Sequence, residues 1–267
     1  MRVLFWNTNK NERINQVLYE IIIENNVTLA ALAEYADDLA QLRGMLACAG
    51  VPMEEYVTIG CDRITIIGSI KDVNPSVQDS YSSTQIINEE IIVCCLHLPS
   101  KIFSTSNDAR KIIANRIVEN IKTVEKEIGS DKVIIVGDFN VNPFEDECID
   151  ATMFHGLPVF EVAKRKERTV AGQSFKMFYN PMWNFFGDHK KPYGTYYYAG
   201  GVSNNPFWSI YDQVIISPSL RDRFVDSSLK IITETNIRYL LDQYGHPDKE
   251  ISDHLPIMFE IMEANYD

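Results

Sequence analysis

Two short blocks of the chain place acidic, amide and imidazole side chains beside apolar segments. One block contains Asp138 and Asn140 near the middle of the chain, and the other is Ser252-Asp253-His254 near its end. Groups of this kind can hold a divalent cation and activate a water molecule. We therefore expect a hydrolytic site, with its residues at the ends of strands.

The middle block follows an apolar run that ends at Val136. In an extended chain, Asp138 and Asn140 share one face while Phe139 points to the other. Phe139 would then enter the core and leave both polar groups facing one pocket. The alternative is a loop in which Asp138 and Asn140 bond to their own backbone.

Two more polar residues close apolar runs in the same way. Glu34 follows Leu29–Ala33, and Asn7 follows Trp6. Carboxylates such as Glu34 and Asp253 suit Mg²⁺ or Mn²⁺, which accept few protein ligands. Asn7 could orient a carboxylate or touch the metal. Taken alone, Glu34 is more simply a carboxylate at the solvent edge, and Asn7 a turn cap.

Two histidines stand at comparable positions. His97 ends an apolar run, and His254 lies in the turn before the predicted strand 255–261. Asp212 is a candidate partner for His254, because an aspartate fixes the tautomer of a histidine and favours the protonated ring. Such a ring can contact phosphate oxygens. The remaining histidines lie in polar loop contexts and are expected at the surface: His155, His189 and His246.

The elements that must position these residues follow from hydrophobic periodicity and breakers. Strands are predicted at 2–7, 28–34, 90–98, 132–136, 210–216 and 255–261, with a hairpin across 56–70. Helices are predicted at 11–25, from an Asp37 cap to Cys48, and at 108–128. Strands alternate with helices first and crowd together later, which favours mixed sheets covered by helices. Ligands usually bind outside strand ends in such sheets.

Composition sets the class of protein. The 267 residues are 45% hydrophobic and show no linker or repeat, so a single domain, 1–267, is predicted. The sequence shows no signal-peptide pattern and no apolar run long enough to cross a bilayer. Its five cysteines form no CxxC motif, and we expect them to be reduced thiols in the core. These features predict a cytoplasmic protein. The net charge of −12 opposes nonspecific binding to a phosphate backbone, but it does not exclude nucleic acid as a binding partner.

In chain order the motifs are Phe5-Trp6-Asn7, Leu32-Ala33-Glu34-Tyr35, His97-Leu98-Pro99-Ser100, Gly137-Asp138-Phe139-Asn140, Tyr211-Asp212 and Ser252-Asp253-His254. This order resembles the endonuclease/exonuclease/phosphatase superfamily, and the resemblance spans nearly the whole chain. It implies an α/β (α+β) fold, a four-layer sandwich of two packed mixed β-sheets flanked by helices. It also implies hydrolysis of a phosphoester that depends on Mg²⁺ or Mn²⁺. No single subfamily is indicated.

The resemblance also implies roles for individual residues. Glu34 would be the principal metal ligand, with Asp253 nearby and Asn7 in support. Asp138 and Asn140 would position or deprotonate the attacking water. His254, oriented by Asp212, would stabilise charge on the phosphorus group, and His97 would contact the phosphate or help to protonate the leaving oxygen. The apurinic-site enzymes of the family tend to carry Tyr at the position of His97, so this chain departs from them there.

A basic and aromatic stretch at about 161–208 is the least familiar part of the chain. Its aromatic rings could stack on bases, or they could pack against a sheet edge as a long insertion. We expect packing for most of the rings and contact with substrate for some of the Lys and Arg. Lys176 in this stretch, and Lys101 and Arg110 near His97, are candidates to bind substrate phosphate, with surface solvation as the alternative.

Three functions fit these observations. The first is a metal-dependent nuclease acting on DNA or RNA. The second is a phosphatase or phosphodiesterase acting on a small-molecule or lipid-headgroup phosphoester, which the acidic composition would suit. The third is a binding module without activity, which the full set of acidic and imidazole groups argues against.

Overall fold

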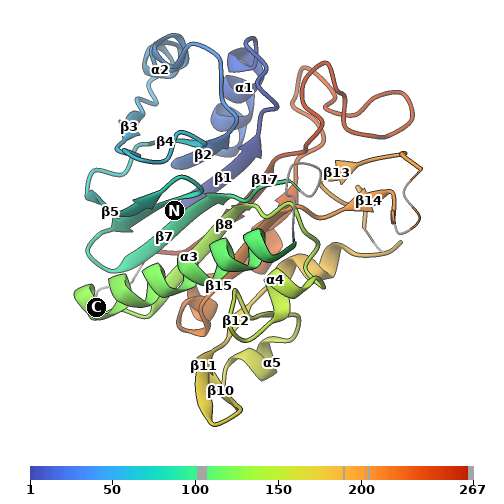
Figure 1. The fold of residues 1–267 in the computed structure, drawn as a ribbon. Helices are drawn as coiled ribbons and strands as arrows, with labels where there is room; N and C mark the ends of the chain where they lie inside the picture. The colour runs from blue at the N-terminus through green and yellow to red at the C-terminus, as the bar shows by residue number, and fades with distance from the viewer. Residues whose placement is uncertain (101–106, 189, 202, 204, 264–267) are drawn as a thin grey trace.

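The computed structural model describes residues 1–100, 107–188, 190–201, 203 and 205–263, and two β-sheets form its centre (Figure 1). The first sheet contains β1 (Arg2–Asn7), β2 (Leu29–Ala33), β3 (Glu54–Tyr56), β4 (Ile64–Gly68), β16 (Lys230–Ile231) and β17 (Ile257–Glu260). The second contains β5 (Val73–Asp79), β6 (Ser82–Ile87), β7 (Ile91–His97), β8 (Lys132–Asp138), β9 (Gly156–Leu157), β12 (Phe178–Tyr179) and β15 (Asp212–Ile216). Their strand orders are β16-β17-β1-β2-β4-β3 and β5-β6-β7-β8-β15-β12-β9.

Helices lie outside these sheets, and two small hairpins extend from them. The helices are α1 (Asn15–Asn25), α2 (Leu39–Cys48), α3 (Asn107–Ile128), α4 (Asp146–Ile149) and α5 (Phe160–Ala163), with 3-10 helices η1 (Pro181–Phe185), η2 (Pro218–Arg223) and η3 (Asp226–Ser228). The hairpins pair β10 (Glu167–Val170) with β11 (Gln173–Lys176), and β13 (Tyr196–Tyr197) with β14 (Trp208–Ser209).

Apolar side chains fill the space between the two sheets. Phe5 and Ile66 of the first sheet share one buried cluster with Val93 and Val136 of the second. Alternate residues of β7 and β8 point the other way, into a second cluster with apolar residues of α3. Figure 1 shows α1 and α2 on one side of the paired sheets and α3 on the other. The predicted sandwich of two mixed sheets flanked by helices is confirmed.

The topology brings the chemically important strand ends to one edge. β1 runs parallel to β2, and β7 runs parallel to β8, so Asn7, Glu34, His97 and Asp138 all lie at or just after carboxyl ends. β15 is antiparallel to β8 and pairs Asp212 with Asp138, so its first residue reaches the same edge. β17 is antiparallel to β1 and also starts there.

A glycine allows β8 to pass close to β7. Gly137 pairs with Leu96 of β7, and a Cβ added at Gly137 would lie 2.0 Å from the backbone oxygen of Leu96. No side chain fits in that space. The glycine that precedes Asp138 therefore serves the close approach of two strands.

Strands β5 and β6 were not predicted, because their composition is polar. Ser83, Thr84 and Gln85 are buried in β6, where an apolar run would be expected. Gln85 Nε2 donates to the Val57 oxygen at 2.8 Å. Hydrogen bonding of this kind lets a polar strand occupy the interior.

Smaller differences concern one cap and one cysteine. The predicted Asp37 cap of α2 is wrong by one residue: Asp38 accepts from Gln41 N at 3.0 Å, while Asp37 accepts from Asn15 N. The prediction of core thiols is wrong for Cys48, which is exposed, whereas the other four cysteines are buried.

The 161–208 stretch extends the second sheet through β12. Its Phe178, Tyr179 and Phe185 are buried, as expected for a packed insertion. Three of its lysines pair with acidic side chains, namely Lys164 with Glu161, Lys166 with Asp131, and Lys176 with Glu125. Among the described residues, no helix combines the length and apolar character needed to cross a membrane.

Candidate active site

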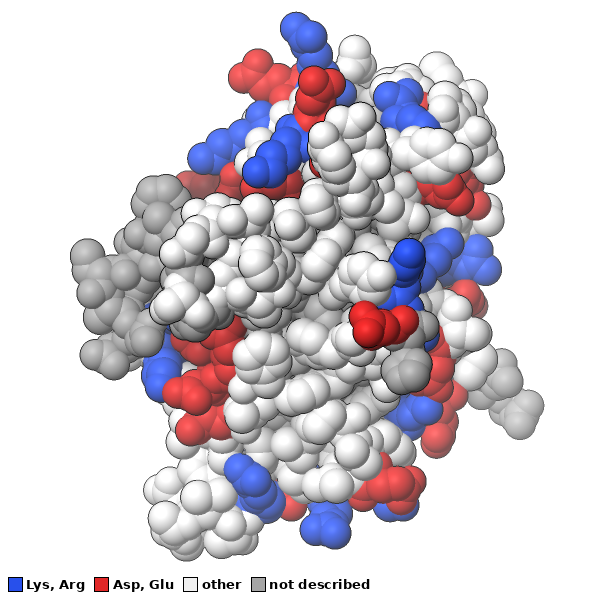
Figure 2. Space-filling model, turned by 90° about the vertical axis from the view of Figure 1, so that its right-hand side faces the viewer, with Lys and Arg blue, Asp and Glu red and all other residues white. Residues whose placement is uncertain are grey.

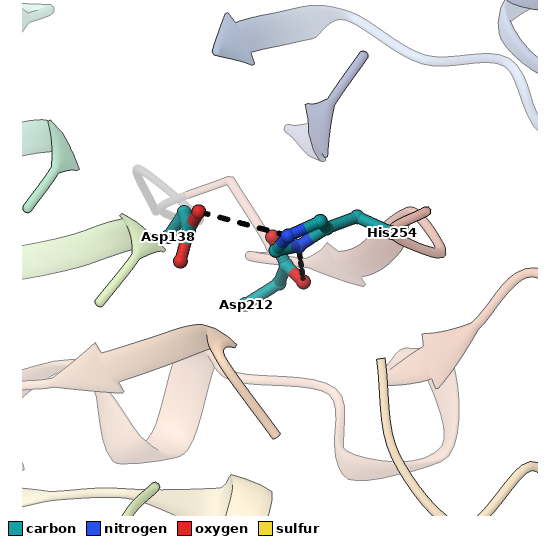
Figure 3. A group of neighbouring side chains, drawn as sticks. All are labelled: Asp138, Asp212 and His254. Carbon is teal, nitrogen blue, oxygen red and sulfur yellow. Dashed lines mark hydrogen bonds and ion pairs between the residues drawn. The ribbon is translucent and has the colours of Figure 1, made fainter. Parts of the chain in front are cut away.

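The carboxylate of Asp138 is the centre of a buried polar cluster. Asn7 Nδ2 donates to its Oδ2 at 2.9 Å, and His97 Nε2 lies 3.6 Å from the same oxygen. His254 Nε2 approaches that oxygen at 4.0 Å (Figure 3). Asp138 is only 1% exposed, so these nitrogens replace the water that the carboxylate would otherwise bind.

The turn after Asp138 combines the two alternatives drawn from the sequence. Asn140 has a φ of 52°, and its backbone N–H donates to Asp138 Oδ1 at 2.8 Å, which is a local turn. Its side-chain Nδ2 also donates to Asp138 Oδ2 at 3.1 Å and to the Leu98 oxygen at 2.9 Å. Phe139 is buried with its ring against Phe154. The apolar anchor thus holds both polar side chains together at the strand end.

Asp212 and His254 form a buried pair. His254 Nδ1 lies 2.8 Å from Asp212 Oδ2, and Trp6 Nε1 donates to the backbone oxygen of His254 at 2.8 Å. Burial lowers the pKa of His254, but the charges of Asp212 and Asp138 outweigh it and raise that pKa to about 10. Burial raises the pKa of Asp212, and the charge of His254 opposes that rise. The neighbouring carboxylates thus favour the protonated form of the imidazole.

Glu34 occupies a strained position directly after β2. Its φ is 50°, a region that non-glycine residues rarely adopt. Two hydrogen bonds to its backbone oxygen hold this conformation, one from Thr8 Oγ1 at 2.9 Å and one from Lys10 N at 3.0 Å. The side chain remains 27% exposed, and its Oε1 lies 3.6 Å from His97 Nε2.

The C-terminal block is tied to β1 by Ser252, a motif residue without a predicted role. Ser252 Oγ donates to the Asn7 oxygen at 2.7 Å and accepts from His254 N at 3.1 Å. Asp253 between them is partly exposed, and its charge contributes to the raised pKa of His254. Ser252 therefore sets where Asp253 and His254 stand relative to Asn7.

Tyr196 and Thr195 complete one side of the cluster. The Tyr196 ring lies 4.8 Å from the His254 ring between centroids, and Thr195 Oγ1 accepts from Asp212 N at 3.1 Å. Burial raises the pKa of Tyr196 to about 12, and the charge of Asp253 adds to the rise. Neither residue stands in a motif, so the sequence carried no signal for them.

Glu34 and Asp253, the cation ligands expected from the sequence, both offer carboxylate oxygens and are partly exposed, which leaves room for water ligands. A second set of donors, from Asp138, Asp212 and His254, lies within 4.8 Å of one another. A cation held by that set would have to displace the proton of His254, because a protonated ring has no lone pair to donate.

Two of the predicted substrate-binding residues are occupied elsewhere. Lys176 Nζ lies 3.4 Å from the Asp131 oxygen, before the start of β8, whereas Asp138 ends that strand. At about 3.3 Å per residue the two ends are roughly 20 Å apart, so Lys176 lies outside the cluster. Arg110 is buried, and its Nε donates to Glu147 at 2.9 Å, which joins α3 to α4.

Two residues named from the sequence, Lys101 and His189, lie outside the described residues. His155 is buried, not at the surface as predicted, and its Nδ1 lies 2.7 Å from the Lys176 oxygen. The other candidates lie at or next to the strand ends described above. They are Asn7, Glu34, His97, Asp138, Asn140, Asp212, Asp253 and His254.

No protein-family model matches the sequence, and a search of curated proteins also gives no match. Solved structures do match over nearly the whole chain. A "3'-5' exonuclease" from Neisseria meningitidis has a TM-score of 0.60 at 15% identity, covering 98% of this chain and 100% of its own. An "AP Endonuclease" from Archaeoglobus fulgidus has a TM-score of 0.57 at 12% identity, covering 98% of this chain and 99% of its own.

A third structure carries the family name itself. It is an endonuclease/exonuclease/phosphatase family protein from Bacteroides thetaiotaomicron, with a TM-score of 0.58 at 13% identity, covering 98% of this chain and 97% of its own. At identities this low, the structural matches show a shared fold. The chain has the fold of the endonuclease/exonuclease/phosphatase superfamily.

Proposed function

We propose that this chain is a divalent-metal-dependent phosphodiester hydrolase that acts on DNA or RNA. The observation that carries the proposal is the surroundings of Asp138 Oδ2, with nitrogens of Asn7, His97 and His254 at 2.9, 3.6 and 4.0 Å. The donors around it hold the carboxylate in one orientation. The similar folds of an "AP Endonuclease" and a "3'-5' exonuclease" support the same class of reaction.

Each residue has a distinct part in this proposal. Asp138 accepts the proton of the attacking water, with its orientation held by Asn7 and Asn140. His254, kept protonated by Asp212, donates to a phosphoryl oxygen as negative charge develops there. His97 stands between Glu34 and Asp138 and contacts the phosphate or the leaving oxygen.

Glu34 and Asp253 would hold a Mg²⁺ or Mn²⁺ ion at the exposed side of this cluster. When bound, such an ion polarises a phosphoryl oxygen and lowers the pKa of its water. Asn7 has its Oδ1 engaged by Asn9 N at 3.0 Å and its Nδ2 engaged by Asp138, so we assign it to orientation rather than to the first contacts of the ion.

The net charge of −12 favours a second candidate function, hydrolysis of a small or lipid-headgroup phosphoester. Such a substrate offers fewer phosphates for an acidic surface to repel.

One set of assays separates the two functions. Plasmid, single-stranded oligonucleotides and RNA are incubated with the protein in Mg²⁺, in Mn²⁺ and in chelator. The nuclease proposal expects cleavage that stops in chelator and falls by at least about 10²-fold in Asp138→Asn and His254→Ala. The exposed Asp222→Asn variant is the matched control and keeps full activity. Silence on nucleic acids together with hydrolysis of phosphoinositides or sphingomyelin would reverse the order of the two candidates.

A further inference from the structure

Arg63 lies at the rim of the candidate active site, although no sequence motif contains it. Its backbone oxygen accepts from Glu34 N at 3.3 Å, since Ile64 at the start of β4 pairs with Ala33 at the end of β2. The Arg63 side chain is exposed. Within the described part of the chain, no carboxylate forms an ion pair with it. A guanidinium group next to the proposed cation ligand Glu34 thus has no acidic partner among those residues.

The guanidinium of Arg63 is held in place by a tyrosine of the second sheet. It lies 4.8 Å from the centroid of the Tyr81 ring, which packs against the buried cluster on the α3 side. Asp79 fixes the turn that carries this ring. Its Oδ1 accepts from Tyr81 N at 2.8 Å, and its Oδ2 lies 3.2 Å from Arg116 Nε of α3. A guanidinium that is stacked on a ring still presents its N–H groups to an anion, and it loses little conformational entropy when it binds one.

A closed circuit of contacts joins Arg63 and Tyr81 to the cluster. Glu34, whose N–H donates to Arg63, has its Oε1 3.6 Å from His97 Nε2. His97 N in turn donates to the Tyr81 oxygen at 2.9 Å, and the Tyr81 ring lies against Arg63. Two of these contacts connect the first sheet with the second, one between Glu34 and His97 and one between Arg63 and Tyr81. The guanidinium is therefore confined to the neighbourhood of the Glu34–His97 contact.

Cationic side chains are scattered elsewhere on the surface. On the side that carries β13 and β14, the Lys and Arg of the described residues lie in small separate groups with uncharged surface between them (Figure 2). With a net charge of −12, such a protein can contact only a few phosphates of a strand at once. Arginine suits such a single contact, because its planar fork can donate two hydrogen bonds to one phosphate.

We propose that Arg63 binds a non-scissile phosphate of a nucleic acid strand whose scissile phosphate lies at the candidate active site. The position of the scissile phosphate rests on the proposed function. The contact of Arg63 with phosphate is measured as binding, so it can hold or fail separately. The competing role for Arg63 is structural, as a clamp between the two sheets.

The test uses fluorescein-labelled oligothymidylate and the small diester bis(p-nitrophenyl) phosphate, which has no phosphate beside the scissile one. Binding of the strand is measured by fluorescence anisotropy in Ca²⁺ between about 50 and 200 mM salt. Values of kcat/KM are measured in Mg²⁺ on both substrates. The variants are Arg63→Ala, Arg63→Lys and Arg165→Ala. Arg165 is the matched control, because it is exposed and its neighbour Lys166 pairs with Asp131, before the start of β8 and thus opposite the site.

We expect Arg63→Ala to reduce the slope of log K against log salt by about 0.7, the contribution of one phosphate contact on a single strand. Its kcat/KM on the strand should fall by about 10- to 100-fold, as for the loss of one charged hydrogen bond. Its kcat/KM on the small diester should match wild type. Arg63→Lys keeps the charge and should keep the slope, but its affinity should be intermediate because the fork is lost. Arg165→Ala should behave as wild type throughout.

The phosphate contact is overturned by an unchanged slope in Arg63→Ala, or by the same change in Arg165→Ala. An equal loss of kcat/KM on both substrates would also overturn it, in favour of the clamp. If the strand is bound with a slope that depends on Arg63 but is never cleaved, the proposed nuclease function fails and the phosphate contact stands. Cleavage together with an unchanged slope in Arg63→Ala would give the reverse. If wild type neither binds nor cleaves the strand, both fail.

Discussion

His97 and Asp138 lie opposite each other as the last residues of two parallel strands, and His97 Nε2 is 3.6 Å from Asp138 Oδ2. Parallel strands require a crossover, which α3 provides between β7 and β8. The imidazole and the carboxylate therefore meet only when the whole β7-α3-β8 unit has formed. Asp212 joins the same edge from the antiparallel strand β15, where it pairs with Asp138.

The charge state of His254 depends on Asp212. In Asp212→Asn the largest contribution that raises the pKa of His254 is lost, while burial, which lowers it, remains. We expect the pKa of His254 to fall from about 10 and the phosphodiesterase rate at neutral pH to fall about 10²- to 10³-fold. An NMR titration of the His254 ring, beside single-turnover rates, measures both. An unchanged ring pKa would show that Asp212 does not set it.

Binding of the proposed cation should depend on the carboxylate of Glu34. A ligand that binds only the folded state stabilises it, by about 2.7 kcal/mol at a concentration of 100 times Kd. Wild type should therefore melt at higher temperature when Mn²⁺ is added to the metal-free protein, and Glu34→Gln should not. Glu250→Gln, an exposed glutamate close to the site in sequence, is the matched control and should respond as wild type. An equal Mn²⁺ response in Glu34→Gln would remove Glu34 from the ligand set.

The strands that carry the site could be predicted from sequence because they are apolar and fully buried. β2 and β8 show continuous apolar runs, and the polar residue that ends each run marks the strand end. The pairing of Asp212 with His254 was also predictable as chemistry, since a buried imidazole needs a partner. The structure shows this pairing, with His254 Nδ1 2.8 Å from Asp212 Oδ2.

The rest could not be predicted, because it depends on tertiary contacts between polar groups. Lys176 was a candidate for phosphate binding, but a salt bridge to Glu125 of α3 holds it at the far end of β8. Tyr196 belongs to a strand of two residues, too short to show any period. Its position over His254 follows from an isolated bridge between these two residues.

Gly137 should be intolerant of any side chain. An alanine Cβ at this position would lie 2.0 Å from the Leu96 oxygen, so the two parallel strands would have to separate. We expect Gly137→Ala to lower the free energy of unfolding by more than about 2 kcal/mol, measured by urea denaturation. Gly44→Ala is the control, because nothing lies within 4 Å of its added Cβ and alanine favours a helix. Equal stability of the Gly137→Ala protein and wild type would contradict the close approach.

The Asp212–His254 pair should also make stability depend on pH in the alkaline direction. The folded-state pKa of His254 is about 10, above its ordinary value of 6.5. Below the ordinary value both states carry the proton, and the folded state has the full benefit of the charged pair. As pH rises toward the folded-state pKa the unfolded chain loses its proton first, so the benefit declines and is lost once the folded ring also deprotonates. In chelator, the free energy of unfolding of wild type should therefore fall from neutral pH to about pH 10. His254→Gln should show a shallower fall, because glutamine does not titrate. If the free energy of unfolding of the two proteins falls in parallel with pH, His254 does not keep its proton in the folded state any longer than in the unfolded chain.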